Sequence, residues 1–200
     1  MKLQRETNWK KISLSDLTSY MEQLNWCIRL KGLRHGDRVY VAHQLSKVDV
    51  WIAVAVESSP SWLRDMAAKL EAGFRASSAT ELVACPLPFY LANLEFLGYR
   101  SNVSAGAIAE IIFEWDAFDY VIAGFKDAMS QPAALAIVSF DDFAIFAGTT
   151  EFALPIVGDL SSARQEFEAF ALGEDRSDLK RVAGAMRAYG KLEEGCTVTF

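Results

Sequence analysis

Histidine and cysteine, the side chains that most often carry nucleophilic, acid–base or metal chemistry, are scarce in this 200-residue chain. The chain holds His35, His43, Cys27, Cys85 and Cys196. No two cysteines have CxxC spacing, which excludes a zinc finger, and an odd number of thiols fits a reducing compartment better than a disulfide framework. GxGxxG, Walker A, HExxH and GxSxG motifs are also missing. The common phosphate-binding, zinc-protease and hydrolase chemistries therefore have no sequence support.

Positive charge and long apolar runs are also in short supply. The chain has 20 Lys and Arg against 26 Asp and Glu, a net charge of −6. Such a field repels phosphate backbones and anionic lipid and attracts a basic protein, so neither nucleic acid nor a membrane is an expected partner. The start, MKLQRETNWKK, lacks the apolar core of a signal peptide, and the longest apolar run, 50–56, falls far short of the roughly 20 residues of a spanning helix. We expect a cytoplasmic protein.

Apolar residues are what the chain does have, at 52% of the sequence. At this length they suffice for a continuous core without disulfides or metals, and no linker-like or low-complexity run interrupts them. We therefore predict one globular domain over residues 1–200. Hairpin-length connections dominate, while helices separate two groups of strands. The expected fold is α/β or α+β, with helices packed on a mixed, mostly antiparallel sheet of about six strands.

The strongest strand signal is a hairpin over residues 133–150, rich in β-branched and aromatic residues. Neither arm alternates apolar with polar residues, so we expect both faces of this pair to be covered. Asp141 and Asp142 are placed at the turn. The exit, Gly148 to Thr150, has the composition of either an anion-binding loop or a plain helix cap. The cap is favoured because Glu151 follows and no Lys or Arg is near.

In the first half of the chain, Ser13 and Asp16 resemble a capping box for a helix that reaches Leu24. A strand over 26–30, which would carry Cys27, and a polar turn over 31–37 are predicted next. The remaining predictions are strands over 38–44 and 48–56, a helix beginning with Ser59 and Pro60, a strand over 81–85 that ends at Pro86, and a short helix over 89–97.

Residues 104–125 have two interpretations. As one helix, they would place Asp119 in the middle of the apolar face, where an unpaired carboxylate costs several kcal/mol. We prefer a break near Trp115, with Asp116 capping a second helix and Asp119 in its first turn. Toward the C-terminus we predict a helix over 160–172 capped by Ser161 or Ser162, a helix capped by Ser177, and an edge strand over 196–200.

None of the histidines or cysteines is favoured as a site. His35 falls in a polar turn, and His43 falls on a strand face with Val39 and Val41, where a hydrogen-bonded structural histidine is the simpler interpretation. Each cysteine is better explained as a small apolar filler than as a nucleophile. Cys27, His35 and His43 are spaced by eight residues, which matches no metal-ligand pattern, so no metal site, cofactor or catalytic residue is predicted.

The segment from Glu110 to Tyr120 mixes carboxylates with large aromatic rings. Such a mixture suits a surface that binds a basic protein, because rings supply contact area and carboxylates supply steering and charge-assisted hydrogen bonds. An ordinary amphipathic helix with a solvated acidic face is the alternative, and an acid–base pair is a weaker one. Asp141 and Asp142 would extend this surface if the fold brings them near it. The candidate partner-binding residues are Glu110, Glu114, Trp115, Asp116, Asp119, Asp141 and Asp142.

The strand and Gly-Thr-Thr-Glu-Phe exit at residues 143–152 resemble segments of small bacterial immunity proteins, over these ten residues only. The resemblance implies an inhibitor that neutralises a toxin. With the acidic charge, it favours a non-enzymatic cytoplasmic protein that binds a basic protein partner such as a toxin or nuclease. The alternative is a small-molecule-binding protein or enzyme that uses His43, a cysteine or a loop carboxylate. The oligomeric state stays open.

Overall fold

The fold is taken from a computed structural model of the chain. It describes residues 8–35, 38–46, 51–58, 60–87, 98–114, 119–127, 130–139, 143–174, 177–189 and 197–199. The helices of this part are α1 (Leu14–Cys27), α2 (Pro60–Ala76), α3 (Ala105–Glu114), α4 (Thr150–Val157), α5 (Leu160–Gly173) and α6 (Ser177–Tyr189). The strands are β1 (Lys10–Lys11), β2 (Ile28–His35), β3 (Arg38–Ser46), β4 (Ile52–Glu57), β5 (Glu81–Leu87), β6 (Tyr99–Asn102), β7 (Asp119–Phe125), β8 (Ala134–Ser139), β9 (Phe143–Gly148) and β10 (Thr197–Thr199).

The strands form two sheets. The larger has seven strands in the order β1-β6-β5-β7-β8-β9-β4, and the smaller has the order β10-β3-β2. Every described pairing is antiparallel. The predicted mixture of helices and a mostly antiparallel sheet is confirmed, although the main sheet is larger than expected.

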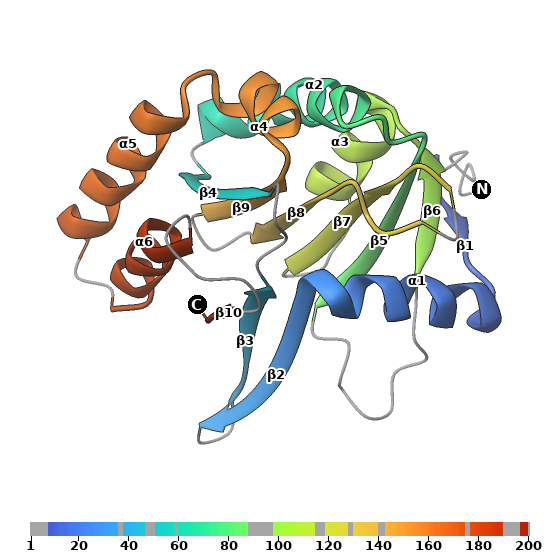
Figure 1. Cartoon of the computed structure of the whole chain (residues 1–200), viewed down its shortest axis with the longest axis horizontal. Coiled ribbons are helices and arrows are strands. Elements are labelled where there is room, and N and C mark those ends of the chain that lie inside the picture. Colours follow the sequence, from blue (N-terminus) through green and yellow to red (C-terminus); the bar gives the residue numbers. More distant parts are fainter. Residues whose placement is uncertain are drawn as a thin grey trace, which may run out of the picture.

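Helices cover both faces of the seven-stranded sheet (Figure 1). Successive residues of β8 alternate between two apolar clusters, with Leu135 and Ile137 in one and Ala136 and Val138 in the other. The first cluster includes side chains of α1 and α6, and the second includes side chains of α2, α3 and α4. Because a strand points successive side chains to opposite faces, this alternation gives three layers. The prediction that the hairpin is covered on both faces is confirmed.

α5 closes the β4 edge of the sheet. Its Ala163 belongs to one apolar cluster and its Phe167 to the other, so the helix passes from one layer to the next beside β4. The Nη2 of Arg164 donates a hydrogen bond to the backbone oxygen of Ala53 at 3.3 Å. A sheet edge leaves backbone groups without strand partners, and a covering helix is one way to protect them.

The close contact between α2 and α4 depends on Gly73. A Cβ atom at this position would lie 2.6 Å from the backbone oxygen of Phe152. Glycine therefore lets the two helices approach with backbone nearly touching backbone. Gly158, with a φ of 74°, ends α4 and turns the chain into α5. These two glycines fix how α4 and α5 sit against the β4 edge.

The first correction concerns Cys27, which ends α1 and does not lie on a strand. Leu17, Tyr20, Leu24 and Cys27 are buried at helical spacing, so the inward stripe continues one turn further than predicted. The Ser13 cap itself is confirmed, because its Oγ accepts the Asp16 backbone N–H at 3.2 Å. The predicted polar turn at 31–37 is wrong over residues 31–35, which belong to β2 and pair with β3.

The second correction concerns the second helix predicted after Trp115. The break is confirmed, because α3 ends at Glu114, but residues 119–125 form β7 instead of a helix. β7 lies in the middle of the sheet and is buried on both faces. Such a strand is a continuous apolar run, which periodicity cannot distinguish from a buried helix. Asp119 consequently begins a strand and is paired with Ser139 of β8.

Two element ends also differ from the prediction. β5 continues through Pro86, which lies opposite Tyr120 of β7, beyond the last residue paired with β6. Proline is tolerated where a neighbouring strand has already ended. The cap of α5 is Asp159, whose carboxylate accepts the Ser162 backbone N–H at 2.7 Å, and not Ser161 or Ser162. The helix predicted over 89–97 lies outside the described residues, as does Ser59, the residue predicted to precede Pro60 at the start of α2.

Candidate functional site

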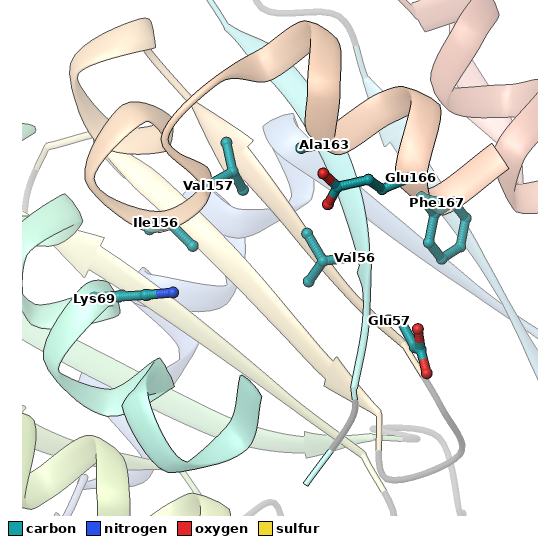
Figure 2. A pocket seen from close by; sticks show the side chains of 8 residues that line it. All are labelled: Val56, Glu57, Lys69, Ile156, Val157, Ala163, Glu166 and Phe167. Atoms are coloured by element: carbon teal, nitrogen blue, oxygen red, sulfur yellow. The ribbon is translucent and has the colours of Figure 1, made fainter. Parts of the chain in front are cut away.

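A cleft of about 300 Å³ lies beside β4, between α2 and the α4–α5 pair (Figure 2). Its apolar lining comes from Val56, Ile156, Val157, Ala163 and Phe167. Val56 is the penultimate residue of β4, and α4 and α5 supply the other four side chains. The tight packing of α4 against α2 at Gly73 sets one wall, and the crossing of α5 over the sheet edge sets another.

Three charged side chains surround this apolar floor: Glu57, Lys69 and Glu166. Figure 2 shows the Lys69 ammonium reaching inward from α2 and the Glu166 carboxylate turned toward the same space from α5. Val56, Ile156 and Val157 lie between the two groups in this view, and Glu57 directs its carboxylate away. Within the described part of the chain, neither Lys69 nor Glu166 forms an ion pair. The cleft therefore presents opposite, unneutralised charges across an apolar surface.

The outer surface of α4 and α5 is strongly acidic. Between Thr150 and Glu174 there are five carboxylates and a single cation, Arg164, which is turned inward onto the β4 backbone. The same two helices carry the only exposed large hydrophobic residues of the described chain, Leu154 at 43% and Leu172 at 73% exposure. We call this surface the α4–α5 face; its residues are Glu151, Leu154, Asp159, Glu166, Glu168, Leu172 and Glu174.

Two carboxylates of the α4–α5 face have lowered pKa values. Hydrogen bonds from the backbone and side chain of Ser162 lower the pKa of Asp159. The backbone N–H of Glu151 and the Thr149 side chain lower the pKa of Glu151. Glu151 thus occupies the first turn of α4, where Thr149 is the cap residue. This arrangement favours the plain helix cap over an anion-binding loop at Gly148 to Thr150.

The opposite end of the sheet has a second, polar groove of about 430 Å³, lined by Asn8, Lys10, Glu81, Arg100, Ser101, Asn102 and Ser104. Much of its polar chemistry is already engaged. The buried Tyr20 hydroxyl donates a hydrogen bond to Glu81, and burial together with this carboxylate raises the pKa of Tyr20 to about 12. Glu71 of α2 accepts hydrogen bonds from the Ala105 backbone and from Arg75, which lower its pKa.

Of the residues predicted to bind a partner, Glu110 is the one whose side chain is described. Its Oε2 accepts the backbone N–H of Asn8 at 2.9 Å and the side-chain amide of Asn8 at 3.1 Å. Beside it, Trp9 Nε1 donates to the Ala107 backbone oxygen at 2.8 Å. Glu110 therefore attaches the segment before β1 to α3. This structural role was not anticipated from the sequence.

The other predicted partner-binding residues are not brought together by any described contact. Glu114 is the last residue of α3, and Asp119 is the first residue of β7. Trp115, Asp116, Asp141 and Asp142 lie outside the described residues. The surface predicted from this segment therefore stays a prediction.

The thiols in the described chain are sealed in the core. Cys27 and Cys85 are buried, and the loss of solvent raises the pKa of each thiol to about 12. A thiol of this kind is a poor nucleophile because the thiolate is the reactive form. His35 ends β2 and His43 lies on β3, opposite Leu30. Among the described residues, no cluster of His, Cys, Asp and Glu has the arrangement of a metal site.

The α4–α5 face was missed at the sequence level because its carboxylates are spaced along two helices and a loop. One signal was available in the sequence. Leu172 falls outside the inward stripe of α5, whose buried members are Ala163, Phe167 and Ala171. A large apolar residue outside such a stripe indicates an exposed contact residue.

No helix in the described ranges is both long and apolar enough to span a bilayer. Comparisons of the chain with protein families, with curated proteins and with solved structures found no match.

Proposed function

We propose that this protein is a non-enzymatic binding protein whose partner is a basic protein, and that the α4–α5 face is the contact surface. An inhibitor or immunity protein that neutralises a basic toxin or nuclease is the form of this function that we favour. The observation that carries the proposal is the coincidence of five carboxylates, on α4, on α5 and at the two caps of α5, with both exposed leucines of the described chain.

The chemistry of the face suits such a partner. Its carboxylates supply steering and charge-assisted hydrogen bonds to Lys and Arg, which raise association rates and select against acidic proteins. Leu154 and Leu172 supply apolar contact area, which carboxylates alone do not provide. Arg164, the one cation of the segment, is directed toward the Ala53 backbone and so does not oppose a basic partner.

The test is affinity capture from the native cell extract, followed by quantitative mass spectrometry and measurement of the dissociation constant for the captured protein. The test variant combines Glu166→Lys with Glu174→Lys. The matched control combines Asp16→Lys with Glu22→Lys on α1, which lies away from α4 and α5 (Figure 1). Both variants change the net charge from −6 to −2, so they differ only in where the charge is placed.

We expect the α4–α5 reversal to weaken the complex by about tenfold or more and to flatten its salt dependence, while the α1 reversal has a much smaller effect. A third variant, Glu110→Lys with Glu114→Lys and Asp116→Lys, tests the surface predicted from the sequence. The proposal fails if the wild-type protein captures no stoichiometric basic protein. The assignment to α4 and α5 fails if the two matched reversals weaken the complex equally.

A further inference from the structure

The cleft beside β4 sets Glu166, a residue of the α4–α5 face, opposite Lys69, which the basic-partner proposal does not use. Lys69 and Glu166 approach it from different helices, α2 and α5, and are not paired with each other or with any other group in the described chain. Two opposite charges that face the same space normally close into a surface ion pair when their side chains can reach. Here Val56, Ile156 and Val157 lie between them (Figure 2).

We propose that this cleft binds a small zwitterion. The carboxylate of the ligand would bind Lys69, its ammonium group would bind Glu166, and its hydrocarbon part would rest on Val56 and on the half-buried Val157. Each charge of the ligand is then met by an opposite charge, and the apolar portion covers the apolar floor. A volume of about 300 Å³ is at the lower end of small-molecule sites, which suits a compact ligand.

The cleft also selects by net charge. Glu166 faces the cleft and Glu57 lines its rim with the carboxylate directed away, against the single ammonium of Lys69, so the surroundings of the site are negative. A zwitterion with an additional cation is therefore tolerated, whereas a ligand with a second carboxylate is disfavoured. The polar groove at the other end of the sheet does not offer the same opportunity, because its Glu81 is bonded to Tyr20 and its Asn8 to Glu110.

The experiment is a titration of the wild-type protein with ω-amino acids of increasing length, from glycine through β-alanine and γ-aminobutyrate to ε-aminocaproate, together with valine and leucine. Binding is followed by calorimetry and by amide chemical shifts. We expect saturable 1:1 binding with one preferred separation of the two charges. n-Butylamine and butyrate, which each keep one charge, should bind about tenfold more weakly or worse, because one charge-assisted hydrogen bond is lost.

Three variants locate the site. Lys69→Gln and Glu166→Gln should each weaken binding of the preferred ligand by about tenfold or more, while Glu174→Gln, at the C-cap of α5 and outside the lining of the cleft, should leave it unchanged. The double exchange Lys69→Glu with Glu166→Lys should restore binding, because a zwitterion can bind in the reversed orientation, with its carboxylate at position 166 and its ammonium group at position 69. All variants alter exposed or half-buried side chains and should fold, which circular dichroism checks.

The proposal is overturned if no compound of the series shows saturable binding, if the singly charged compounds bind as well as the zwitterions, or if Lys69→Gln and Glu166→Gln bind like the wild type. None of these outcomes bears on capture of a basic protein by the α4–α5 face, so the two proposals fail independently.

Discussion

The two ends of the seven-stranded sheet use polar side chains in opposite ways. At the β6 end, Glu81 is bonded to Tyr20 and Glu71 to Arg75 and the Ala105 backbone. At the β4 end, Lys69 and Glu166 have no ion-pair partner among the described residues and lie beside an apolar floor. Polar groups that hydrogen-bond to one another support the fold, whereas charged groups that line a cleft without such partners are available to a ligand or partner. The difference points to the β4 end as the functional one.

Both ends are built on the same apolar layers, but they differ in what reaches the surface. The exposed leucines of the described chain, Leu154 and Leu172, are both at the β4 end. There α5 covers the β4 edge of the sheet with one side and faces solvent with the other. The helix that protects the edge therefore also forms part of the candidate contact surface. The following predictions test this division between structural and functional polar groups.

The largest expected effect is on the apolar support of the β4 end. Phe152 is fully buried, and its ring centroid lies 5.0 Å from that of Phe74. Phe152→Ala should lower the free energy of unfolding by about 3–5 kcal/mol, because a large core side chain is lost and a cavity remains. Urea unfolding measures this change. Leu154→Ala, on the same helix but exposed, is the control and should change it by less than about 0.5 kcal/mol; equal losses would contradict the assignment of the two positions.

Tyr20→Phe should give the next largest loss in the free energy of unfolding, about 1–3 kcal/mol. It removes the hydrogen bond that the Tyr20 hydroxyl donates to the Glu81 carboxylate at the edge of the core. The effect depends on pH. The pKa of Tyr20 is raised from 10.0 to about 12 in the folded protein, so the folded state holds the proton more tightly than the unfolded state. The corresponding stabilisation is complete below pH 10.0 and is lost as the pH rises toward about 12.

The measurement is urea unfolding of the wild type and of Tyr20→Phe at pH values on both sides of 10.0. The difference between the two proteins should shrink above pH 10.0. A difference that stays constant up to about pH 12 would show that Tyr20 does not titrate with this raised pKa.

Glu71→Gln should have a smaller effect, below about 1 kcal/mol, because the pair with Arg75 is partly exposed. The pKa of Glu71 is lowered in the folded protein, chiefly by its hydrogen bond from Arg75. Its stabilisation is therefore present above the ordinary value of 4.5 and is lost as the pH falls below it. Thermal unfolding at neutral and acidic pH should show the wild type and the variant converging in acid; a gap that widens in acid would contradict the pairing.

The smallest effect is expected at the β4 end. Lys69→Gln and Glu166→Gln should each change the free energy of unfolding by less than about 0.5 kcal/mol, because neither side chain has an ion-pair partner in the described chain. The same urea unfolding assay applies. A loss as large as that of Tyr20→Phe would mean that these charges support the fold, and the contrast between the two ends would disappear.

Much of the fold followed from local signals. The helix begun by Ser13, the helix begun by Pro60 and the β8–β9 hairpin were predicted because capping, proline geometry and β-branched enrichment act within a few residues. β7 was missed because burial on both faces removes its period-two pattern. The strand character of residues 31–35 was missed because it depends on pairing with β3.

The sequence by itself determined the mixture of helices and antiparallel strands, the acidic charge and the apolar faces, since these depend on composition and on spacing over one or two turns. The tertiary structure alone decided that Glu110 attaches to Asn8, that Arg164 turns inward, and that Lys69 and Glu166 share one cleft. These outcomes depend on how α2, α4 and α5 pack around the β4 edge. No local pattern encodes that packing, because it joins residues that are distant in the chain.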